Sequence, residues 1–106
     1  MTTERQSMGG EPVFPLVHAN GTPISLLQAD YTNAQRMLVR AMLHFQSIDF
    51  NQRDYYPLGE TAFEAAKAER LRIAECLKSA ETYLTNHVEY LVEVRDNIAT
   101  QRTGEG

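Results

Sequence analysis

Apolar residues recur at every third or fourth position through residues 61–102, a spacing that keeps side chains on one face of an α-helix. Alternating steps of three and four are typical of a helix that packs along its whole length against another. Two members of the stripe, Arg70 and His87, are polar. Thr61 followed by Glu64 resembles a capping box, so we expect a long helix from Thr61 to about Arg102. The stripe consists of Phe63, Ala66, Arg70, Ile73, Leu77, Ala80, Leu84, His87, Leu91, Val94 and Ile98.

The same spacing predicts an earlier helix from Pro23 to about Gln46. Thr22 is a good N-cap and Pro23 suits the first helical position. Gly21 can supply the positive φ of a tight turn before it. The predicted contact stripe of this helix is Leu27, Tyr31, Ala34, Leu38, Ala41, Phe45 and Ile48.

Residues 49–60 interrupt the helical pattern with turn formers and aromatics, and Pro57 disfavours helical geometry before it. Two helices joined by a connection of this length fold back on each other as an antiparallel hairpin. Residues 12–17 contain two prolines and four apolar residues, so we expect an extended strap across a helix surface. The sequence thus predicts one all-α domain over residues 12–102, a disordered tail over 1–11 and a frayed end over 103–106.

The predicted helices differ in length, at roughly 36 Å and roughly 60 Å. We therefore expect the last turns of the long helix, with Leu91 and Val94, to extend beyond the partner helix as an apolar overhang. A two-helix hairpin also buries little core. Both points predict self-association into a homo-oligomeric helical bundle.

Composition narrows the function classes. The chain has 106 residues, of which 42% are hydrophobic and 23% charged, and this balance is typical of one globular domain. A net charge of −4 disfavours general nucleic-acid binding. No apolar run reaches the roughly 20 residues of a membrane span, and residues 1–10 lack the apolar core of a secretion signal. We expect a cytoplasmic protein without a membrane partner.

The sequence gives no positive sign of an enzyme. The histidines are not spaced as metal ligands, and neither a glycine-rich phosphate loop nor a nucleophile elbow is present. The single cysteine, Cys76, excludes an intramolecular disulfide framework, and its mid-helix position favours a small buried hydrophobe. We predict no catalytic residues, no metal and no cofactor.

One candidate binding place lies at the loop end of the hairpin. Guanidinium groups clamp phosphate or carboxylate, and tyrosine rings stack on bases. The alternative is that Arg70 pairs with Glu69 or Asp54 while the loop tyrosines only cap the core. The candidate residues here are Arg53, Tyr55, Tyr56, Arg70, Arg40 and His44.

A second candidate place is the turn before the first helix. His18, Asn20 and Thr22, together with free N–H groups at the helix start, would form an anion cradle, and His87 is expected at the same level. The alternative is that His18 and Asn20 only fix the turn, and that His87 is a satisfied residue of the helix contact. The two places lie at opposite ends of the hairpin, so they can share a pocket only between subunits.

Two motifs carry a resemblance over residues 14–90. The turn His18-Ala19-Asn20-Gly21-Thr22 and the loop Arg53-Asp54-Tyr55-Tyr56-Pro57 resemble a group of small phage and prophage proteins of unassigned function. The resemblance implies a phage-side accessory protein, which would act in the host cytoplasm. By analogy of size and helicity alone, such a protein is similar to oligomeric phage proteins that sequester nucleotide signals of bacterial immunity.

These observations together predict a non-enzymatic, homo-oligomeric protein that binds a small anionic ligand, with a nucleotide immune signal as one candidate. The alternative is an adaptor or inhibitor that docks a host or virion protein through the apolar overhang.

Overall fold

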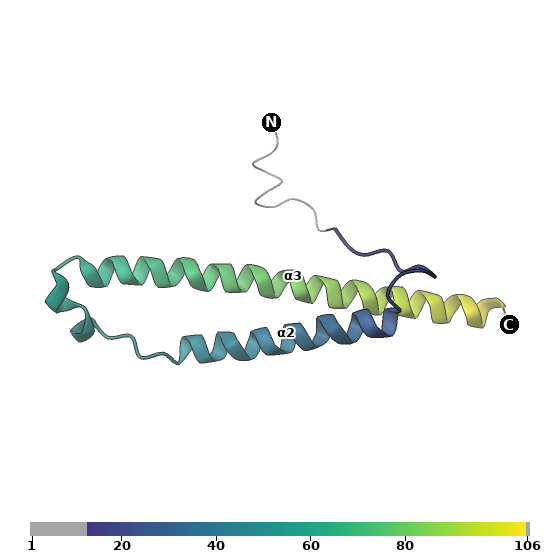
Figure 1. Cartoon of the computed structure of the whole chain (residues 1–106), viewed down its shortest axis with the longest axis horizontal. Helices are drawn as coiled ribbons and strands as arrows, with labels where there is room; N and C mark the ends of the chain where they lie inside the picture. Colours follow the sequence, from purple (N-terminus) through teal and green to yellow (C-terminus); the bar gives the residue numbers. More distant parts are fainter. Residues whose placement is uncertain (1–12, 106) are drawn as a thin grey trace, which may run out of the picture.

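The structure is a computed structural model that describes residues 13–105, with side chains described for residues 13–100. It contains two long helices, α2 (Ile24–Gln46) and α3 (Ala62–Glu105), joined by the short 3-10 helices η1 (Gln52–Asp54) and η2 (Tyr56–Leu58). The long helices lie side by side and antiparallel (Figure 1). No strand occurs within residues 13–105. The predicted all-α helical hairpin is confirmed, whereas the predicted tail over 1–11 and Pro12 of the predicted strap lie outside the described residues.

The start of α2 differs by one residue from the prediction. Pro23 is extended, with φ −58° and ψ 146°, and its carbonyl accepts the N–H groups of Leu26 and Leu27 at 3.1 and 3.0 Å. The helix therefore begins at Ile24, and Thr22 is not its N-cap.

Gly21 does not have the positive φ that we expected. Among the described residues, the glycine with a positive φ is Gly59, at 125°. The side chain of His18 lies over Gly21 instead, so that a Cβ there would meet His18 Nε2 at 2.8 Å. Gly59 ends η2 and turns the chain toward α3.

The end of α3 also differs from the prediction. The helix continues to Glu105, past the expected end near Arg102 and through most of the segment expected to fray. Its C-terminal turns extend beyond the start of α2 (Figure 1).

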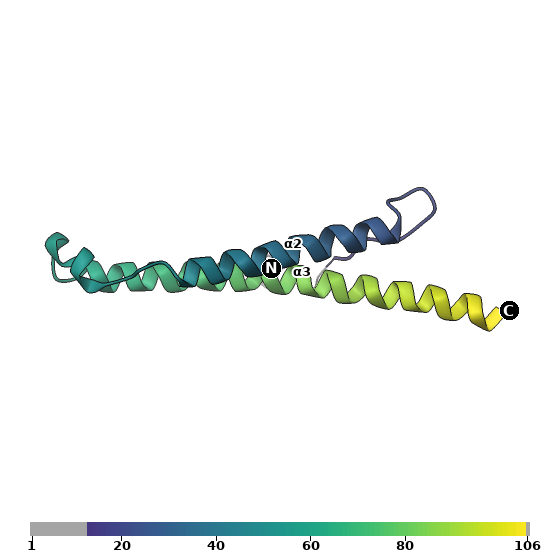
Figure 2. The same cartoon turned by 90° about the horizontal axis from the view of Figure 1, so that it is seen from below.

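Contacts spaced along the hairpin fix the register of the two helices. Arg70 Nη2 donates to the Phe45 carbonyl at 3.0 Å near the loop. At the other end Arg95 Nη1 donates to Gln28 Oε1 at 3.4 Å. The helices cross at a shallow angle between these points, as a comparison of Figure 1 with Figure 2 shows.

This register corrects the predicted overhang. Phe63 in the first turn of α3 packs against Phe50 and Tyr55 of the loop rather than against α2. The contact with α2 is consequently shifted along α3 toward its C-terminus. Leu91 has no exposed surface and Val94 is partly buried, so neither provides a free apolar surface.

The face by which α2 contacts α3 is rotated from the predicted stripe. Ala34, Ala41 and Ile48 of that stripe are exposed. Instead Gln35 lies in the contact, where its Nε2 donates to Thr85 Oγ1 at 3.3 Å, and Thr85 Oγ1 donates to Glu81 Oε2 at 3.3 Å. The partly buried residues of α2 in this contact are Gln28, Tyr31, Gln35, Leu38, Met42 and Phe45.

The core of the hairpin is thin. Among residues 13–100, Leu91 is the only fully buried hydrophobic side chain, and His87 is the only buried polar one. The radius of gyration is 20.4 Å, against about 13 Å for a compact domain of this length. A single copy of the chain therefore leaves much of its apolar surface in contact with water.

Candidate functional site

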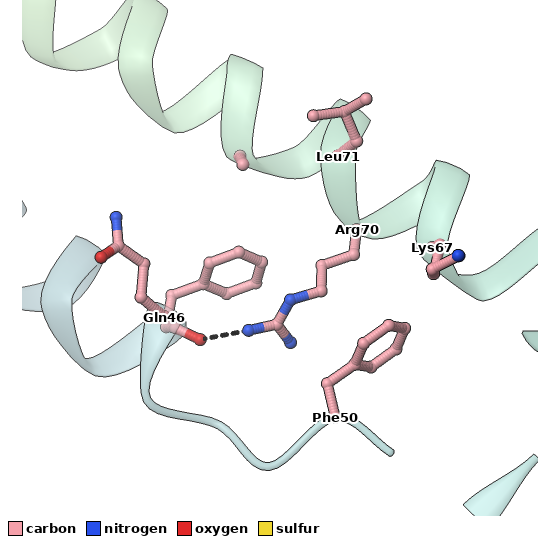
Figure 3. A pocket seen from close by; sticks show the side chains of 7 residues that line it. Gln46, Phe50, Lys67, Arg70 and Leu71 are labelled. Carbon is pink, nitrogen blue, oxygen red and sulfur yellow. Dashed lines mark hydrogen bonds between the residues drawn. The ribbon is translucent and has the colours of Figure 1, made fainter. Parts of the chain in front are cut away.

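Arg70 organises the loop end of the hairpin. Its guanidinium carbon lies 4.8 Å from the ring centroid of Phe45 and 4.9 Å from that of Phe50. Its Nη2 donates to the Phe45 carbonyl, one of the last carbonyls of α2, which lack partners within the helix. Figure 3 shows Arg70 reaching from α3 toward the end of α2, with Phe50 presented by the loop. Two rings and one hydrogen bond thus fix the plane of the guanidinium.

An aromatic cluster in turn positions Phe50. The Phe50 centroid lies 5.4 Å from that of Tyr55 and 5.1 Å from that of Phe63. Tyr55 and Phe63 are 5.8 Å apart. The loop is therefore held against the start of α3 by ring packing.

An open pocket of about 380 Å³ lies beside Arg70, between the end of α2 and α3. Lys67 brings a second cation to it. The Nζ of Lys67 is 5.2 Å from the Phe63 centroid and 3.3 Å from Glu64 Oε2, in an ion pair that is largely exposed. None of the described residues that line the pocket is acidic. The lining residues are Phe45, Gln46, Phe50, Lys67, Arg70, Leu71 and Ala74.

The surroundings of Arg70 differ on its other side. A hollow of about 290 Å³ there includes Asp49 and Glu69 in its lining. Two carboxylates disfavour the binding of an anion in this hollow. An anionic ligand would therefore be more stable in the pocket that Lys67 lines.

The structure separates the residues that we predicted for this end. Arg70 lines the pocket, and Tyr55 belongs to the aromatic cluster below it. The other four are exposed and do not line the pocket with Lys67. They are Arg53, Tyr56, Arg40 and His44.

Arg40 lies in a separate hollow along α2 that Arg36 also lines, and the His44 carbonyl accepts the Ser47 hydroxyl at 2.7 Å. The alternative pairing of Arg70 with Glu69 or Asp54 is not observed. Glu69 Oε2 instead lies 3.9 Å from Arg72 Nη2.

The second predicted place is not assembled. His18, Asn20 and Thr22 are exposed in the turn before α2, where the Gly21 N–H donates to the His18 carbonyl at 3.0 Å. His87, by contrast, is only 1% exposed. The rings that contact His87 are those of Phe14, Tyr31 and Tyr83, and none of these residues belongs to the turn.

His87 belongs to a second aromatic cluster in mid-hairpin. Its ring stacks on Tyr31 at 4.7 Å and lies 4.2 Å from Tyr83 and 4.9 Å from Phe14. His87 Nδ1 is 2.8 Å from the Tyr83 carbonyl, and because a carbonyl only accepts, Nδ1 carries the hydrogen. Phe14 also stacks on Tyr90 at 4.5 Å. His87 is thus a packed, hydrogen-bonded residue of the helix contact, as the alternative reading predicted.

Burial in this cluster raises the pKa of the Tyr31 phenol above its usual 10.0, with the charge of Tyr83 and a hydrogen bond to it adding to the effect. Tyr31 therefore keeps its proton and acts here as a packing residue.

A hollow of about 250 Å³ adjoins this cluster. Phe14 and Tyr90 line it, but so do the carboxylates of Glu89 and Glu93, which disfavour an anion. The loop-end pocket remains the better candidate for an anionic ligand.

Sequence reasoning missed Lys67 and Phe50 as members of the site. Lys67 precedes Arg70 by three residues, a spacing that places two side chains on neighbouring parts of one helix surface, so this signal was present. The position of Phe50 depends on the loop conformation, which the sequence pattern does not specify.

Comparisons with known proteins add no further assignment. No family model, curated protein or solved structure matches the chain. Among the described side chains, residues 13–100, no group of three or more His, Cys, Asp or Glu residues could hold a metal ion. Neither described helix combines the length and the apolar character needed to cross a bilayer.

Proposed function

We propose that this chain is a non-enzymatic protein that binds and sequesters a small anionic ligand, with a nucleotide as the leading class. One observation carries the proposal: Arg70 and Lys67 share a pocket with two phenylalanine rings and with no acidic residue among those described in its lining.

The chemistry of these groups suits a phosphate. A guanidinium binds phosphate oxygens through parallel N–H donors, and the bond to Phe45 uses only one of the donors of Arg70. Lys67 adds a positive charge at the rim, where Glu64 is its ion-pair partner. The volume of about 380 Å³ lies within the range of small-molecule sites, and the rings offer apolar surface to a base.

Exposed loop residues extend the proposed site. Arg53 on η1 and Tyr56 on η2 lie at the same end of the hairpin, and Tyr56 is 67% exposed. Both can contact the part of a ligand that projects from the pocket. Arg40, His44 and the turn of His18, Asn20 and Thr22 are left out of the proposed site because they lie on other surfaces.

The resemblance to small phage proteins supports a biological setting for this proposal. In that setting the chain acts in the cytoplasm of an infected cell as a homo-oligomer and removes a nucleotide signal of host immunity. The adaptor alternative is not carried further, because Leu91 of its expected docking surface is fully buried.

The test compares two lysines that differ in position but not in chemistry. Lys67 pairs with Glu64 and Lys78 with Glu81, each across three residues of α3. Lys67→Gln should weaken the binding of AMP about fivefold to tenfold in isothermal titration calorimetry, since a charge-assisted contact to phosphate is lost. Lys78→Gln is the matched control and should bind AMP like the parent chain.

Native mass spectrometry of the purified parent gives an independent readout, in which we expect a phosphorylated passenger that Lys67→Gln retains less well. Equal AMP affinity for Lys67→Gln and the parent, or no AMP binding by the parent together with no passenger, would contradict the proposal.

A further inference from the structure

A second apolar stripe runs along α2, about 100° around the helix from the face that contacts α3. Its members within the helix follow in steps of three and four, which is the spacing of a helix contact. Most of this stripe is uncovered, since Ala34 and Ala41 are exposed, Met37 is 56% exposed and Ile48 is 54% exposed. The stripe consists of Leu27, Asp30, Ala34, Met37 and Ala41, and Ile48 continues it just beyond the end of α2.

A matching stripe runs along α3. It too advances in steps of three and four and lies beside the contact with α2. Ile73 is 38% exposed, Tyr83 is 52% exposed, and Cys76 and Ala80 are exposed. Its members are Ala66, Glu69, Ile73, Cys76, Ala80 and Tyr83.

The two stripes lie on the same side of the hairpin. Near the loop, Ile48, which follows the end of α2, lines one hollow with Ala66 and Ile73 of α3. In mid-hairpin, the Tyr83 ring of α3 lies 4.2 Å from the His87 ring, which also stacks on Tyr31 of α2 at 4.7 Å. The stripes therefore form one continuous surface, which we call the double-stripe face.

The double-stripe face has the composition of a helix-bundle interior. Neither stripe contains lysine or arginine, and the two acids, Asp30 and Glu69, belong to opposite ends of the face. Each stripe combines small and large residues, which lets facing layers interdigitate. On α2 the small Ala34 and Ala41 flank Met37, and on α3 the small Cys76 and Ala80 lie between Ile73 and Tyr83.

We propose that a second copy of this chain covers the double-stripe face, so that two hairpins form a four-helix bundle. The self-association is part of the proposed function, and the double-stripe face is the surface through which it would occur. This assembly does not depend on the ligand pocket.

The size of the face supports a second copy. From Leu27 to Ile48 it is about 30 Å long, and two helices are about 20 Å wide, which gives about 600 Å² for each copy. The total of about 1,200 Å² reaches the lower bound for stable protein interfaces. A second copy would also supply the core that one hairpin lacks, where Leu91 is the only fully buried hydrophobic residue in the described side chains.

The test places the same charge on two faces of one helix. Ala41 lies on the double-stripe face and Ala29 on the outer face of α2, and both are exposed. Ala41→Glu, and likewise Ala80→Glu on α3, should convert the parent oligomer into a helical monomer of 12.0 kDa in sedimentation velocity. Ala29→Glu should keep the mass of the parent, and circular dichroism checks that every variant is helical.

The Cys76 thiol is exposed in a single hairpin, so the predicted small buried hydrophobe is wrong, and this native thiol tests the same face without a substitution. Its alkylation by iodoacetamide should slow at least fivefold as the protein concentration rises through the association range. A monomeric parent at about 100 µM would overturn self-association itself. Dissociation by Ala29→Glu but not by Ala41→Glu, or a Cys76 rate unchanged in the oligomer, would overturn the assignment of the face. AMP affinity, measured in the same samples, reports separately on the pocket.

Discussion

The Arg70 guanidinium is held in place before any ligand arrives, because the rings of Phe45 and Phe50 lie 4.8 and 4.9 Å from it and the Phe45 carbonyl accepts a hydrogen bond from it. Such preorganisation reduces the conformational entropy that is lost on binding. The same side chain also donates to the Phe45 carbonyl at the end of α2, which accepts the Ile48 N–H as well. Replacement of Arg70 would therefore disturb folding together with binding, and Lys67, which is more exposed, separates the two effects.

Gly59 is the residue on which the loop conformation depends most directly. Its φ of 125° and ψ of 165° lie in a region that side chains with a Cβ rarely adopt. We predict that Gly59→Ala lowers the free energy of unfolding by roughly 1–3 kcal/mol in urea denaturation. The cause is backbone strain alone, since no atom lies within 4 Å of the added Cβ.

Gly21 is the control for this prediction. Its φ is not positive, and the added Cβ would meet only the end of the exposed His18 side chain. Gly21→Ala should therefore cost clearly less than Gly59→Ala. An equal cost for the two variants would show that strain at Gly59 is not the cause.

At the level of elements, the sequence predicted both helices, the hairpin and the contribution of Arg70 to the loop end. It did not predict which face of α2 meets α3. Two apolar stripes advance along α2 at the same spacing, and Gln35 lies in the one that is used. A hydrophobicity pattern predicts that Ala34 and Ala41, and not Gln35, lie in the contact with α3. In the structure Gln35 lies there, and Thr85 is its hydrogen-bond partner.

The position of Leu91 was mispredicted for a related reason. Helix lengths correctly suggested that α3 extends beyond α2, but they placed Leu91 in the extension. The loop occupies the start of α3 through the contact of Phe50 with Phe63, which moves Leu91 into the contact with α2. Loop packing depends on backbone angles such as that of Gly59, and residue spacing does not encode them.

The polar layer in mid-hairpin gives a prediction about the helix contact. Thr85→Val removes the acceptor of the Gln35 amide, which is partly buried, and should cost about 1 kcal/mol of unfolding free energy. The double variant Gln35→Leu with Thr85→Val removes both partners and should recover most of that loss. Glu81 keeps Lys78 as an ion-pair partner at 3.1 Å in either case.

Urea denaturation of the parent, both single variants and the double variant at one protein concentration completes this thermodynamic cycle. Strictly additive effects would show that the hydrogen bond between Gln35 and Thr85 contributes nothing to stability.

The whole molecule is elongated and its core is thin, so the stability of the fold is expected to depend on association with a second copy. A hairpin with a radius of gyration of 20.4 Å exposes apolar residues on both helices, including Met37 and Ile73. If a second copy covers them, each subunit gains part of its stability from its partner, and that part obeys mass action.

We therefore predict that the melting temperature of the parent rises with protein concentration. Across a hundredfold range, from about 1 to about 100 µM, the shift should be several degrees, because about 2.7 kcal/mol of association free energy is gained. Ala41→Glu should melt at a lower temperature that does not depend on concentration, while Ala29→Glu should follow the parent. A concentration-independent melting temperature for a parent that is oligomeric throughout this range would mean that each hairpin is stable without its partner. The thin core would then suffice for folding, and the double-stripe face would serve only to join folded subunits.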